Sequence, residues 1–411
     1  MADVSMGKNR LLWAKTHMGI MARLSDRLKK EKPLKGLKIA MALHVEAKTG
    51  ILALSLREAG ADVRLASCNP LSTDNSVSEA LNKEYGLPTY AKKGETIKEY
   101  YENLDNVLDI GPDILVDDGA DLITITHTRR KELLEKIIGA NEETTTGVVR
   151  VRAMERGGKL RYPVISVNDA YMKHLFDNRY GTGQSTFDGI MNATNLLVAG
   201  KTVVVAGYGW CGRGIATRAK GMGASIIVTE VDPVRAIEAR MDGFEVMKME
   251  KAAKLADFII SATGDKDVVA GKHLKDIKDG CVLANSGHFN NEISREGIES
   301  FSTSSRKARE FVEEFKLKNG RKIYLLADGR LVNLSAGQGH PVEIMDMSFS
   351  LQLLSAIHLA KHHKKMENKV YPVPNEIDMN VAKLKLEVMG IQIDKLTKEQ
   401  ERYMQSWGEG T

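Results

Sequence analysis

The chain is poor in cysteine, in aromatic residues and in long apolar runs. Only three of its 411 residues are cysteines, Cys68, Cys211 and Cys281, which are too few and too scattered for a disulfide framework or a zinc site. No apolar segment approaches the roughly 18 residues of a membrane-spanning helix, and the N-terminal segment lacks the apolar core of a signal peptide. We therefore expect a cytoplasmic protein without a metal site or a membrane anchor.

An excess of charge of one sign is also absent. The net charge is +5, and basic residues are interspersed with acidic ones, so the sequence shows no electrostatic footprint of a nucleic-acid-binding protein. With 43% hydrophobic residues the chain can bury a large core, and a length of 411 residues predicts two or three domains.

A glycine-rich turn stands near the middle of the sequence. Residues 202–206 are apolar or β-branched and predict a buried parallel strand. Gly207, Gly209 and Gly212 follow in the spacing G-x-G-x-x-G, which allows a tight turn, close approach of a pyrophosphate and close packing of a helix on the strand. A second apolar run ends at Glu230, whose carboxylate suits ribose hydroxyls and repels a 2′-phosphate. The pattern predicts NAD binding, and a glycine turn without a ligand is the weaker alternative.

Polar residues follow the ends of several predicted strands. The first strand, 38–43, leads to His44, and a later one leads to the adjacent carboxylates Asp117 and Asp118. Ligands of open α/β sheets bind at such carboxyl ends of strands. Adjacent carboxylates suit acid–base chemistry, because burial and mutual repulsion raise the pKa of one of them. A structural histidine and a helix N-cap are the alternatives.

Another polar cluster follows the predicted strand 164–167. It includes Asn168, Lys173 and Asp177, and the last two are four residues apart, so they share a face on a helix. A surface ion pair is the ordinary interpretation, but the position beside a strand end and before the glycine turn favours a functional site. The segment 141–147, NEETTTG, predicts a donor-rich loop, because three threonines suit a helix interior poorly.

The remaining sequence alternates between strands and helices. The pattern from 201 to 335 predicts one doubly wound unit, and a long apolar helix is expected over 342–363. Pro372 and Pro374 then mark a linker to a short C-terminal segment.

Ten segments spread over nearly the whole chain carry a resemblance to one family. They are SCNPLSTDN, KKGET, DDGADL, NEETTTG, VND, KHLFDNRYGTGQS, AGYGWCGRG, TEVDP, NSGHF and GRLVNLSAGQGHP. In these segments and their order the chain resembles the S-adenosylhomocysteine hydrolase family. The resemblance implies an α/β fold with two Rossmann-like doubly wound domains and a small C-terminal segment. The implied parts are a substrate domain over 1–180 with a return segment at 342–372, an NAD domain over 181–341 and an oligomerisation segment over 373–411. A homo-oligomer, either a tetramer or a dimer, is implied as well.

The activity implied is reversible hydrolysis of S-adenosyl-L-homocysteine to adenosine and L-homocysteine, with one tightly bound NAD per subunit. In that reaction the 3′-hydroxyl is oxidised, the acidified C4′ proton is removed, homocysteine leaves, water adds and the ketone is reduced again. An ordinary NAD-dependent dehydrogenase and a non-catalytic nucleoside-binding protein are the alternatives. The first has no need of the polar cluster at 168–178, and the second would have lost the acid–base residues.

The resemblance also implies roles for individual residues. The catalytic residues would be His44, Asp118, Glu143, Lys173, Asp177, Asn178 and His288; the substrate-binding residues Glu46, Lys48, Thr49, Asn168 and His340; and the cofactor-binding residues Thr144, Thr145, Thr146, Asn178, Gly207, Gly209, Gly212, Glu230, Thr263, Gly287 and Asn333. Lys173 suits transfer of the 3′-hydroxyl proton if burial lowers its pKa. The segment GQGHP would form a hinge and gate that close the domains over the substrate.

Three features depart from the family's pattern. Thr182 stands where many members carry a cysteine near the nicotinamide, so a proton role is not expected there. The sequence ends at SWGEGT, without the lysine- and tyrosine-bearing tail that reaches a neighbouring subunit's NAD in longer members, which puts that contact in question. Lys48 replaces a Glu or Gln that accepts from the adenine 6-amino group. Because an ammonium only donates, Lys48 suits a 6-oxo base and S-inosyl-L-homocysteine, unless it pairs with Glu46 instead.

Overall fold

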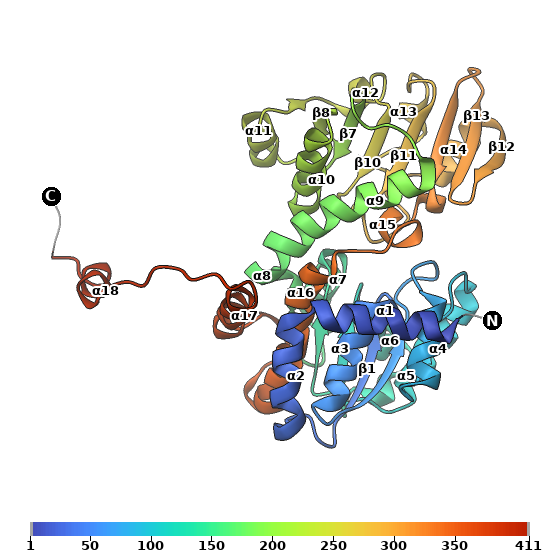
Figure 1. The fold of residues 1–411 in the computed structure, drawn as a ribbon. Coiled ribbons are helices and arrows are strands. Elements are labelled where there is room, and N and C mark those ends of the chain that lie inside the picture. Colours follow the sequence, from blue (N-terminus) through green and yellow to red (C-terminus); the bar gives the residue numbers. More distant parts are fainter. Residues whose placement is uncertain (1–2, 409–411) are drawn as a thin grey trace.

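Two bodies, each built around one β-sheet, form the molecule (Figure 1). The computed structural model of the chain describes residues 3–408. In the first body a seven-stranded sheet has the order β15-β6-β5-β4-β1-β2-β3, and all neighbouring strands are parallel. Its strands are β1 (Lys38–Ala42), β2 (Asp62–Ala66), β3 (Thr89–Tyr90), β4 (Ile114–Asp117), β5 (Gly139–Glu142), β6 (Val164–Ser166) and β15 (Val370–Pro372).

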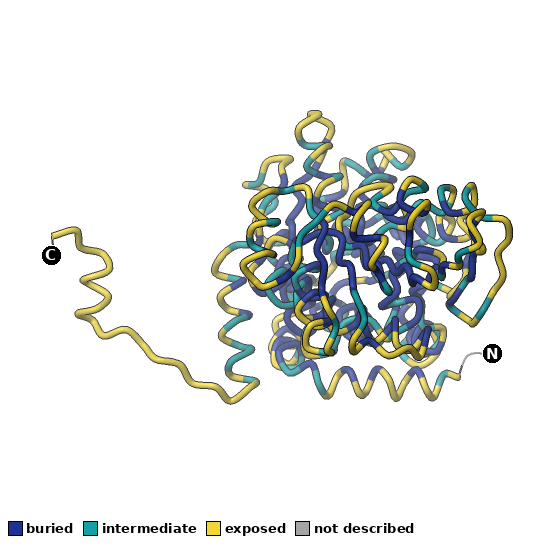
Figure 2. Tube along the Cα trace, turned by 90° about the horizontal axis from the view of Figure 1, so that it is seen from above, coloured by how far each residue is buried: buried dark blue, intermediate teal, exposed yellow. Residues whose placement is uncertain are grey.

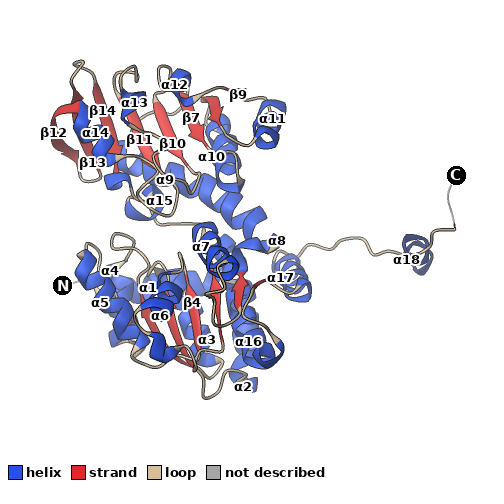
Figure 3. Ribbon diagram, turned by 180° about the vertical axis from the view of Figure 1, so that it is seen from behind, coloured by secondary structure: helices blue, strands red, loops and turns tan. Residues whose placement is uncertain are grey.

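Helices cover both faces of this sheet (Figure 3). On one face lie α3 (Ala47–Glu58), α4 (Asn75–Lys83) and α16 (Val342–His362), and on these helices pack α1 (Val4–His17), α2 (Gly19–Glu31) and α17 (Asn375–Val388). On the other face lie α5 (Ile97–Leu108), α6 (Asp121–Thr128) and α7 (Thr145–Arg156). Along β1, Ile39 and Met41 point into the first layer, whereas Ala40 and Ala42 point into the second. Burial on both faces explains why the sequence shows continuous apolar runs.

The second body contains an eight-stranded sheet with the order β12-β13-β14-β11-β10-β7-β8-β9. Its strands are β7 (Thr202–Ala206), β8 (Ser225–Thr229), β9 (Glu245–Val246), β10 (Phe258–Ser261), β11 (Cys281–Asn285), β12 (Ser302–Arg309), β13 (Val312–Leu317) and β14 (Lys322–Leu326). The strands are parallel except for β12 and β13, an antiparallel hairpin at the edge. The sequence did not predict this hairpin, because β12 is mostly exposed and its residues, STSSRKAR, lack the apolar alternation of a strand.

Helices cover both faces of the second sheet as well. One face packs on α9 (Thr182–Thr194), α10 (Trp210–Gly221), α11 (Pro233–Met241) and α15 (Val332–Ser335), and the other on α12 (Met249–Ala252), α13 (Gly271–Leu274) and α14 (Arg295–Phe301). Short 3-10 turns lie at Lys131–Leu133, Val167–Asp169, Ala327–Gly329 and His363–Lys365. Both bodies are thus α/β units of the Rossmann-like type.

Two chain segments connect the bodies. α8 (Tyr171–Lys173) continues through a π-helical stretch, His174–Gly181, into α9, and residues 336–341 lead back into α16. Every residue of α16 from Met345 to Ile357 is buried, which agrees with the apolar helix predicted there. Stretches of π-helix are rare and occur frequently at functional sites.

The C-terminal part leaves the first body. After α17, residues 391–397 form no helix or strand and are exposed, and they lead to α18 (Lys398–Gln405), which lies away from both bodies (Figures 1 and 2). Within residues 3–408 no helix combines the length and the apolar character needed to cross a membrane.

Candidate active site

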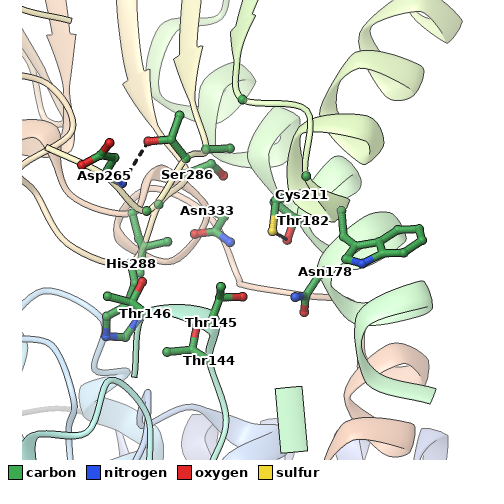
Figure 4. A pocket seen from close by; sticks show the side chains of 18 of the residues that line it. Thr144, Thr145, Thr146, Asn178, Thr182, Cys211, Asp265, Ser286, His288 and Asn333 are labelled. Atoms are coloured by element: carbon green, nitrogen blue, oxygen red, sulfur yellow. Dashed lines mark hydrogen bonds between the residues drawn. The ribbon is translucent and has the colours of Figure 1, made fainter. Parts of the chain in front are cut away.

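A cavity of about 770 Å³ is lined by residues of both bodies (Figure 4). It lies at the carboxyl ends of strands, since His44 follows β1, Asp118 follows β4 and Gly207 follows β7. Of the predicted site residues only Asn168 and Gly212 do not line it. Those that do are His44, Glu46, Lys48, Thr49, Asp118, Glu143, Thr144, Thr145, Thr146, Lys173, Asp177, Asn178, Gly207, Gly209, Glu230, Thr263, Gly287, His288, Asn333 and His340.

Lys173 lies at the centre of a buried charge cluster. Its Nζ donates to Asn178 Oδ1 at 2.8 Å and lies 3.4 Å from Asp177 Oδ1 and 3.5 Å from Glu143 Oε1. All four side chains are almost fully buried. Lys173 and Asp177 therefore form a buried ion pair, and the interpretation as a solvated surface pair is wrong.

The charges of this cluster shift one another's pKa values. Burial alone would lower the pKa of Lys173, but the carboxylates of Asp177 and Glu143 raise it above the ordinary lysine value. The condition under which Lys173 suits proton transfer, a pKa lowered by burial, is therefore not met in the protein by itself. Burial would raise the pKa of Asp177, but Lys173 and His340 hold it below the ordinary carboxyl value. Burial raises the pKa of Glu143 to about 7, although Lys173 opposes that shift.

Helix α16 and His340, two residues before it, hold the carboxylates of Asp177 and Glu143 in place. Ser348 Oγ donates to Asp177 Oδ2 at 2.6 Å, and Gln352 Nε2 donates to Glu143 Oε2 at 2.6 Å. His340 places its Nδ1 2.9 Å from Asp177 Oδ1. Sequence reasoning missed Ser348 and Gln352. A signal was present, because they are polar residues four positions apart in a largely apolar helix and so lie on one face.

Asp118 lies between two histidines that come from different bodies. Its Oδ2 is 3.5 Å from His44 Nε2, and its Oδ1 is 3.5 Å from His288 Nδ1. Burial lowers the pKa of His44 to about 4, so this imidazole is neutral near pH 7. The other ring nitrogen of His44 shares a hydrogen bond with Ser72 Oγ at 2.7 Å, which orients the ring. The arrangement suits proton transfer.

The same three side chains have a second capability. Their ligand atoms lie within 4.8 Å of one another, and within residues 3–408 they form the one group that could hold a metal ion. The sequence predicts no metal site, and the same three side chains also suit acid–base chemistry.

The adjacent carboxylates Asp117 and Asp118 have separate surroundings. Asp117 is fully buried beneath the cavity, where its Oδ2 accepts from Ile123 N at 2.9 Å in the first turn of α6. Its Oδ1 accepts from Asp118 N at 3.1 Å, and burial raises the pKa of Asp117 to about 8. Asp117 therefore accepts from a free N–H of α6 although Ala120 is the N-cap residue, whereas Asp118 faces the cavity.

The NEETTTG segment is not a loop throughout. Helix α7 begins at Thr145, so Thr145 and Thr146 lie in its first turn and face the cavity together with Thr144 (Figure 4). The loop prediction was wrong because threonine is unfavourable in a helix interior but suits an N-terminus. Thr145 Oγ1 donates to Asn168 Oδ1 at 3.2 Å, which also accepts from Asn178 Nδ2 at 3.0 Å. Asn168 thus supports the cavity wall from behind.

Glu46 and Lys48 lie at the start of α3. The Glu46 carboxylate caps the helix by accepting from Lys48 N at 2.9 Å and Thr49 N at 3.2 Å. Lys48 Nζ lies 2.9 Å from Glu46 Oε2 and donates to Gln338 O at 2.9 Å, which joins the first body to the segment before α16. The pairing with Glu46 that stood as an alternative is present, and both side chains still line the cavity.

The glycine turn forms an open cradle at the N-terminus of α10. Gly207 has a φ of +95°, a left-handed conformation that favours glycine. A Cβ on Gly209 would meet only Arg235, at 3.7 Å, so space remains for a pyrophosphate at the helix N-terminus. A Cβ on Gly212 would lie 1.9 Å from Gly207 O, so this glycine packs the helix against the turn. Gly212 therefore has the packing role that the motif gives its third glycine, and its contact with a pyrophosphate stays a prediction.

Glu230 follows β8, as the motif predicts. Its Oε2 accepts from Tyr208 N at 2.7 Å, and its Oε1 accepts from Val231 N at 2.6 Å and Asp232 N at 3.1 Å. These backbone donors orient a carboxylate that also lines the cavity, a position that fits ribose hydroxyls.

The opposite end of the cradle presents an acceptor that lacks a partner. Asn333 Nδ2 donates to Ser185 Oγ at 3.2 Å, whereas its buried Oδ1 has no hydrogen-bond partner among the described residues. The N–H groups of a nicotinamide carboxamide would satisfy this oxygen. Glu292, which sequence reasoning missed for lack of any motif around it, accepts from Thr263 N at 2.9 Å and Gly264 N at 2.8 Å and shapes the nearby loop. The cradle and the free oxygen together fit NAD.

Thr182 and Cys211 form an adjoining part of the wall (Figure 4). Thr182 Oγ1 lies 3.3 Å from His340 Nε2 and 3.6 Å from Cys211 Sγ. Burial raises the pKa of Cys211, so its thiol is protonated near neutral pH.

A dinucleotide cradle and a buried acid–base cluster therefore share one cavity, which defines an NAD-dependent enzyme built from two Rossmann-like bodies. The chain belongs to the S-adenosyl-L-homocysteine hydrolase family. The family model of that description matches residues 1–132, and the model of the family's NAD binding domain matches residues 178–339. NAD is accordingly its cofactor.

Relatives of nearly equal length carry two different names. The chain is 60% identical to an adenosylhomocysteinase from Thermoplasma acidophilum over 407 residues, which cover 99% of either chain. It is 57% identical to an S-inosyl-L-homocysteine hydrolase from Methanocaldococcus jannaschii over 405 residues, or 98% of this chain and 97% of the relative. Among solved structures, a dipicolinate synthase from Bacillus halodurans aligns over 79% of this chain and 98% of that one with 13% identity and a TM-score of 0.46, which carries no argument about function.

Proposed function

We propose that the protein catalyses the reversible hydrolysis of S-adenosyl-L-homocysteine to adenosine and L-homocysteine in the methyl cycle. The observation that supports this most strongly is the buried cluster of Lys173, Glu143 and Asp177, which lies in the same cavity as the dinucleotide cradle. An ordinary dehydrogenase does not need the second acid–base group formed by Asp118 and its two histidines. The relative from Thermoplasma acidophilum carries the corresponding name.

In this proposal the two bodies have separate tasks. Residues 1–180 and 342–372 form the substrate domain, residues 181–341 the NAD domain, and residues 373–411 the oligomerisation segment. The two sheets support this division, because the strands of the first come from residues 38–166 and 370–372 and those of the second from residues 202–326.

The ribose end of the cavity prepares the 3′-hydroxyl for oxidation. Bound NAD supplies the hydride acceptor and returns the hydride at the end of the turnover. Lys173 takes the hydroxyl proton, and Asp177 and Glu143 accept hydrogen bonds from the ribose. A base must be neutral, so the ammonium proton of Lys173 has to move first.

The group around Asp118 serves the elimination and the addition of water. Once C3′ is a ketone, the C4′ proton is acidic, and Asp118 and His44 take this proton and protonate the departing sulfur. Water then adds at C5′ of the C4′–C5′ double bond, and the same residues take a proton from the water and deliver it to C4′. His288 brings the NAD domain onto the other oxygen of Asp118. The buried setting keeps bulk water from the ketone intermediate.

A second candidate substrate is S-inosyl-L-homocysteine. The Nζ of Lys48 lies in the cavity wall beside Glu46 Oε2, so an ammonium donor stands next to a carboxylate acceptor. A 6-oxo purine offers the matching pair, an oxygen acceptor and an N1–H donor. Adenine can also pair with these groups if it lies in the opposite order, so the choice depends on how the base sits.

Initial rates of homocysteine release from both substrates test the proposal. They are measured side by side with a thiol reagent and without added NAD, on the wild type and on Lys48→Met. Preference for the adenosyl compound supports the first substrate, whereas preference for the inosyl compound that Lys48→Met reduces about tenfold supports the second. The control is Lys93→Met, because Lys93 also donates across the bodies, to Ser335 O at 3.0 Å, but does not line the cavity. Release from neither substrate would overturn the proposed function.

We also propose that the protein is a cytoplasmic homo-oligomer, either a tetramer or a dimer. The apolar side chains of Ile391, Ile393, Leu396, Met404 and Trp407 are exposed on a segment that leaves the body, which supports contact with a second copy of the chain. All three cysteines are unpaired, which fits a reducing compartment. Light scattering of the full chain and of a form that ends at residue 390 tests the assembly. A full chain with the mass of a monomer, or a truncated form with as many subunits as the full chain, would count against the proposal.

A further inference from the structure

Helix α16 supplies a hydrogen-bond donor to the ribose end of the cavity. Gln352 Nε2 donates to Glu143 Oε2 at 2.6 Å, and among residues 3–408 no other side chain donates a hydrogen bond to that carboxylate. The backbone of Gln352 is held too, because its carbonyl accepts from Asn141 Nδ2 at 3.0 Å. Both contacts join α16 to β5 and the residues after it, about two hundred residues earlier in the chain.

We propose that Gln352 is a positioning residue that holds Glu143 as an oriented acceptor for the ribose hydroxyls, a role that rests on the proposed function. The contact ties one oxygen of Glu143 to the helix. The other oxygen, Oε1, has no hydrogen-bond donor among the described residues and lies 3.5 Å from Lys173 Nζ. It is therefore the oxygen that remains available to the substrate.

Packing alone does not account for a glutamine at this position. Gln352 is completely buried, and its Oε1 has no hydrogen-bond partner among the described residues. A buried amide with an unsatisfied oxygen destabilises a fold relative to an apolar side chain of the same shape. The amide N–H that faces Glu143 gives a reason for its presence.

The groups around Glu143 determine how its pKa would change if the N–H donor of Gln352 were lost. Lys173 favours the ionised carboxylate, whereas Asp177 and Asp118 disfavour it, as burial does. Gln352 acts in the same direction as Lys173. Without its N–H, Glu143 would be protonated over a wider range of pH and would lose its orientation.

Two variants separate positioning from packing. Gln352→Met keeps the length of the side chain and removes the donor, and Gln352→Glu keeps the shape and adds a second carboxyl. The matched control is Ser355→Ala on the same helix, because Ser355 is fully buried and its Oγ has no hydrogen-bond partner among the described residues. The readouts are the affinity of the NAD-loaded protein for adenosine and inosine as a function of pH, its NAD content and its Tm.

We expect Gln352→Met to weaken nucleoside binding about ten- to a hundredfold, the usual effect of a lost hydrogen bond to a charged group. The midpoint of its pH dependence should move to higher pH, and further still for Gln352→Glu, while NAD content stays at the wild-type level. A lower Tm with an unchanged pH midpoint and unchanged nucleoside affinity would show a packing role and overturn the inference. Homocysteine release by the wild type tests the proposed function separately, and a wild type that binds no nucleoside would overturn both.

Discussion

The two ends of the cavity are built by different means. At the dinucleotide end the backbone does most of the shaping: Gly207 makes the turn, Gly209 leaves space, and Glu230 is oriented by three backbone N–H groups. At the ribose end the side chains of Lys173 and Asp177, with their partners, bring buried charges together. At the dinucleotide end we expect most changes of side chain to be tolerated, but not an added side chain where the backbone packs closely. The ribose end depends on every member of the set, because a buried charge without its partner is costly.

Lys173→Ala should have the largest effect and should separate the two ends. Removal of a positioned general base costs about 10²- to 10⁴-fold in rate, so homocysteine release should nearly vanish. NAD should stay bound, because the glycine turn is shaped by backbone contacts in which Lys173 takes no part. The assays are the initial rate and the NAD released from denatured protein.

The control for that prediction is Lys361→Ala, which changes an exposed lysine in the last turn of α16. It should leave both rate and NAD content unchanged. Near-normal turnover by Lys173→Ala would remove the catalytic assignment of Lys173, and loss of NAD would show that the two ends are not independent.

Gly212→Ala should act on the dinucleotide end of the cavity, and its effect should be smaller than that of Lys173→Ala. The added methyl group would lie 1.9 Å from Gly207 O, so the turn must shift away from the pyrophosphate. We expect NAD affinity to fall roughly ten- to a hundredfold, which corresponds to the few kcal/mol of an overpacked site. NAD titration of the protein stripped of cofactor measures this change.

Gly221→Ala is the matched control, because it lies in the same helix and its added methyl group would meet no atom within 4 Å. It should keep the affinity for NAD and stabilise the fold by about 0.5–1 kcal/mol, since alanine has the higher helix propensity. Equal NAD affinities of the two variants would mean that the glycine turn does not shape the cofactor site.

The buried imidazole of His44 should make the folded protein less stable in acid. Burial lowers the pKa of His44 from 6.5 to about 4, so the folded state favours the neutral ring. This contribution to the free energy of unfolding is fully present above the unfolded pKa of 6.5 and is lost as the pH falls towards 4. Its size is at most about 3 kcal/mol.

Urea unfolding at several values of pH measures that contribution. His44→Gln should lose less stability than the wild type between pH 6.5 and 4, whereas His362→Gln, at the exposed end of α16, should follow the wild type. Parallel curves for all three proteins would contradict the assignment of a buried neutral imidazole.

The same contrast between the two ends of the cavity explains which site residues could be predicted from the sequence. The glycine turn and Glu230 lie within 24 residues of sequence, and each is recognisable from its local pattern. The polar residues after strands were also found, since the carboxyl ends of parallel strands meet at one edge. Ser348 and Gln352 were missed, because what matters about them is the contact with residues that lie 171 and 209 positions away.

Other features could not be decided from the sequence, for equally physical reasons. The pKa of Lys173 is raised and not lowered, because two carboxylates outweigh burial, and only folding brings Glu143 beside it. Gly212 packs closely on the turn, which depends on how closely helix and strand approach. Lys48 pairs with Glu46 and still lines the cavity, two possibilities that the sequence presents as alternatives.

The sequence by itself determined the fold class, the NAD turn and the membership of the family, because apolar periodicity, glycine spacing and long shared segments are local properties of the chain. Only the tertiary structure decided which side chains share protons, which carboxylate is a cap and which reaches the cavity, and how α16 holds the ribose end. Those properties depend on burial and on distances of a few ångströms between residues far apart in sequence, and a change of one such distance alters both the charge and the orientation of a group.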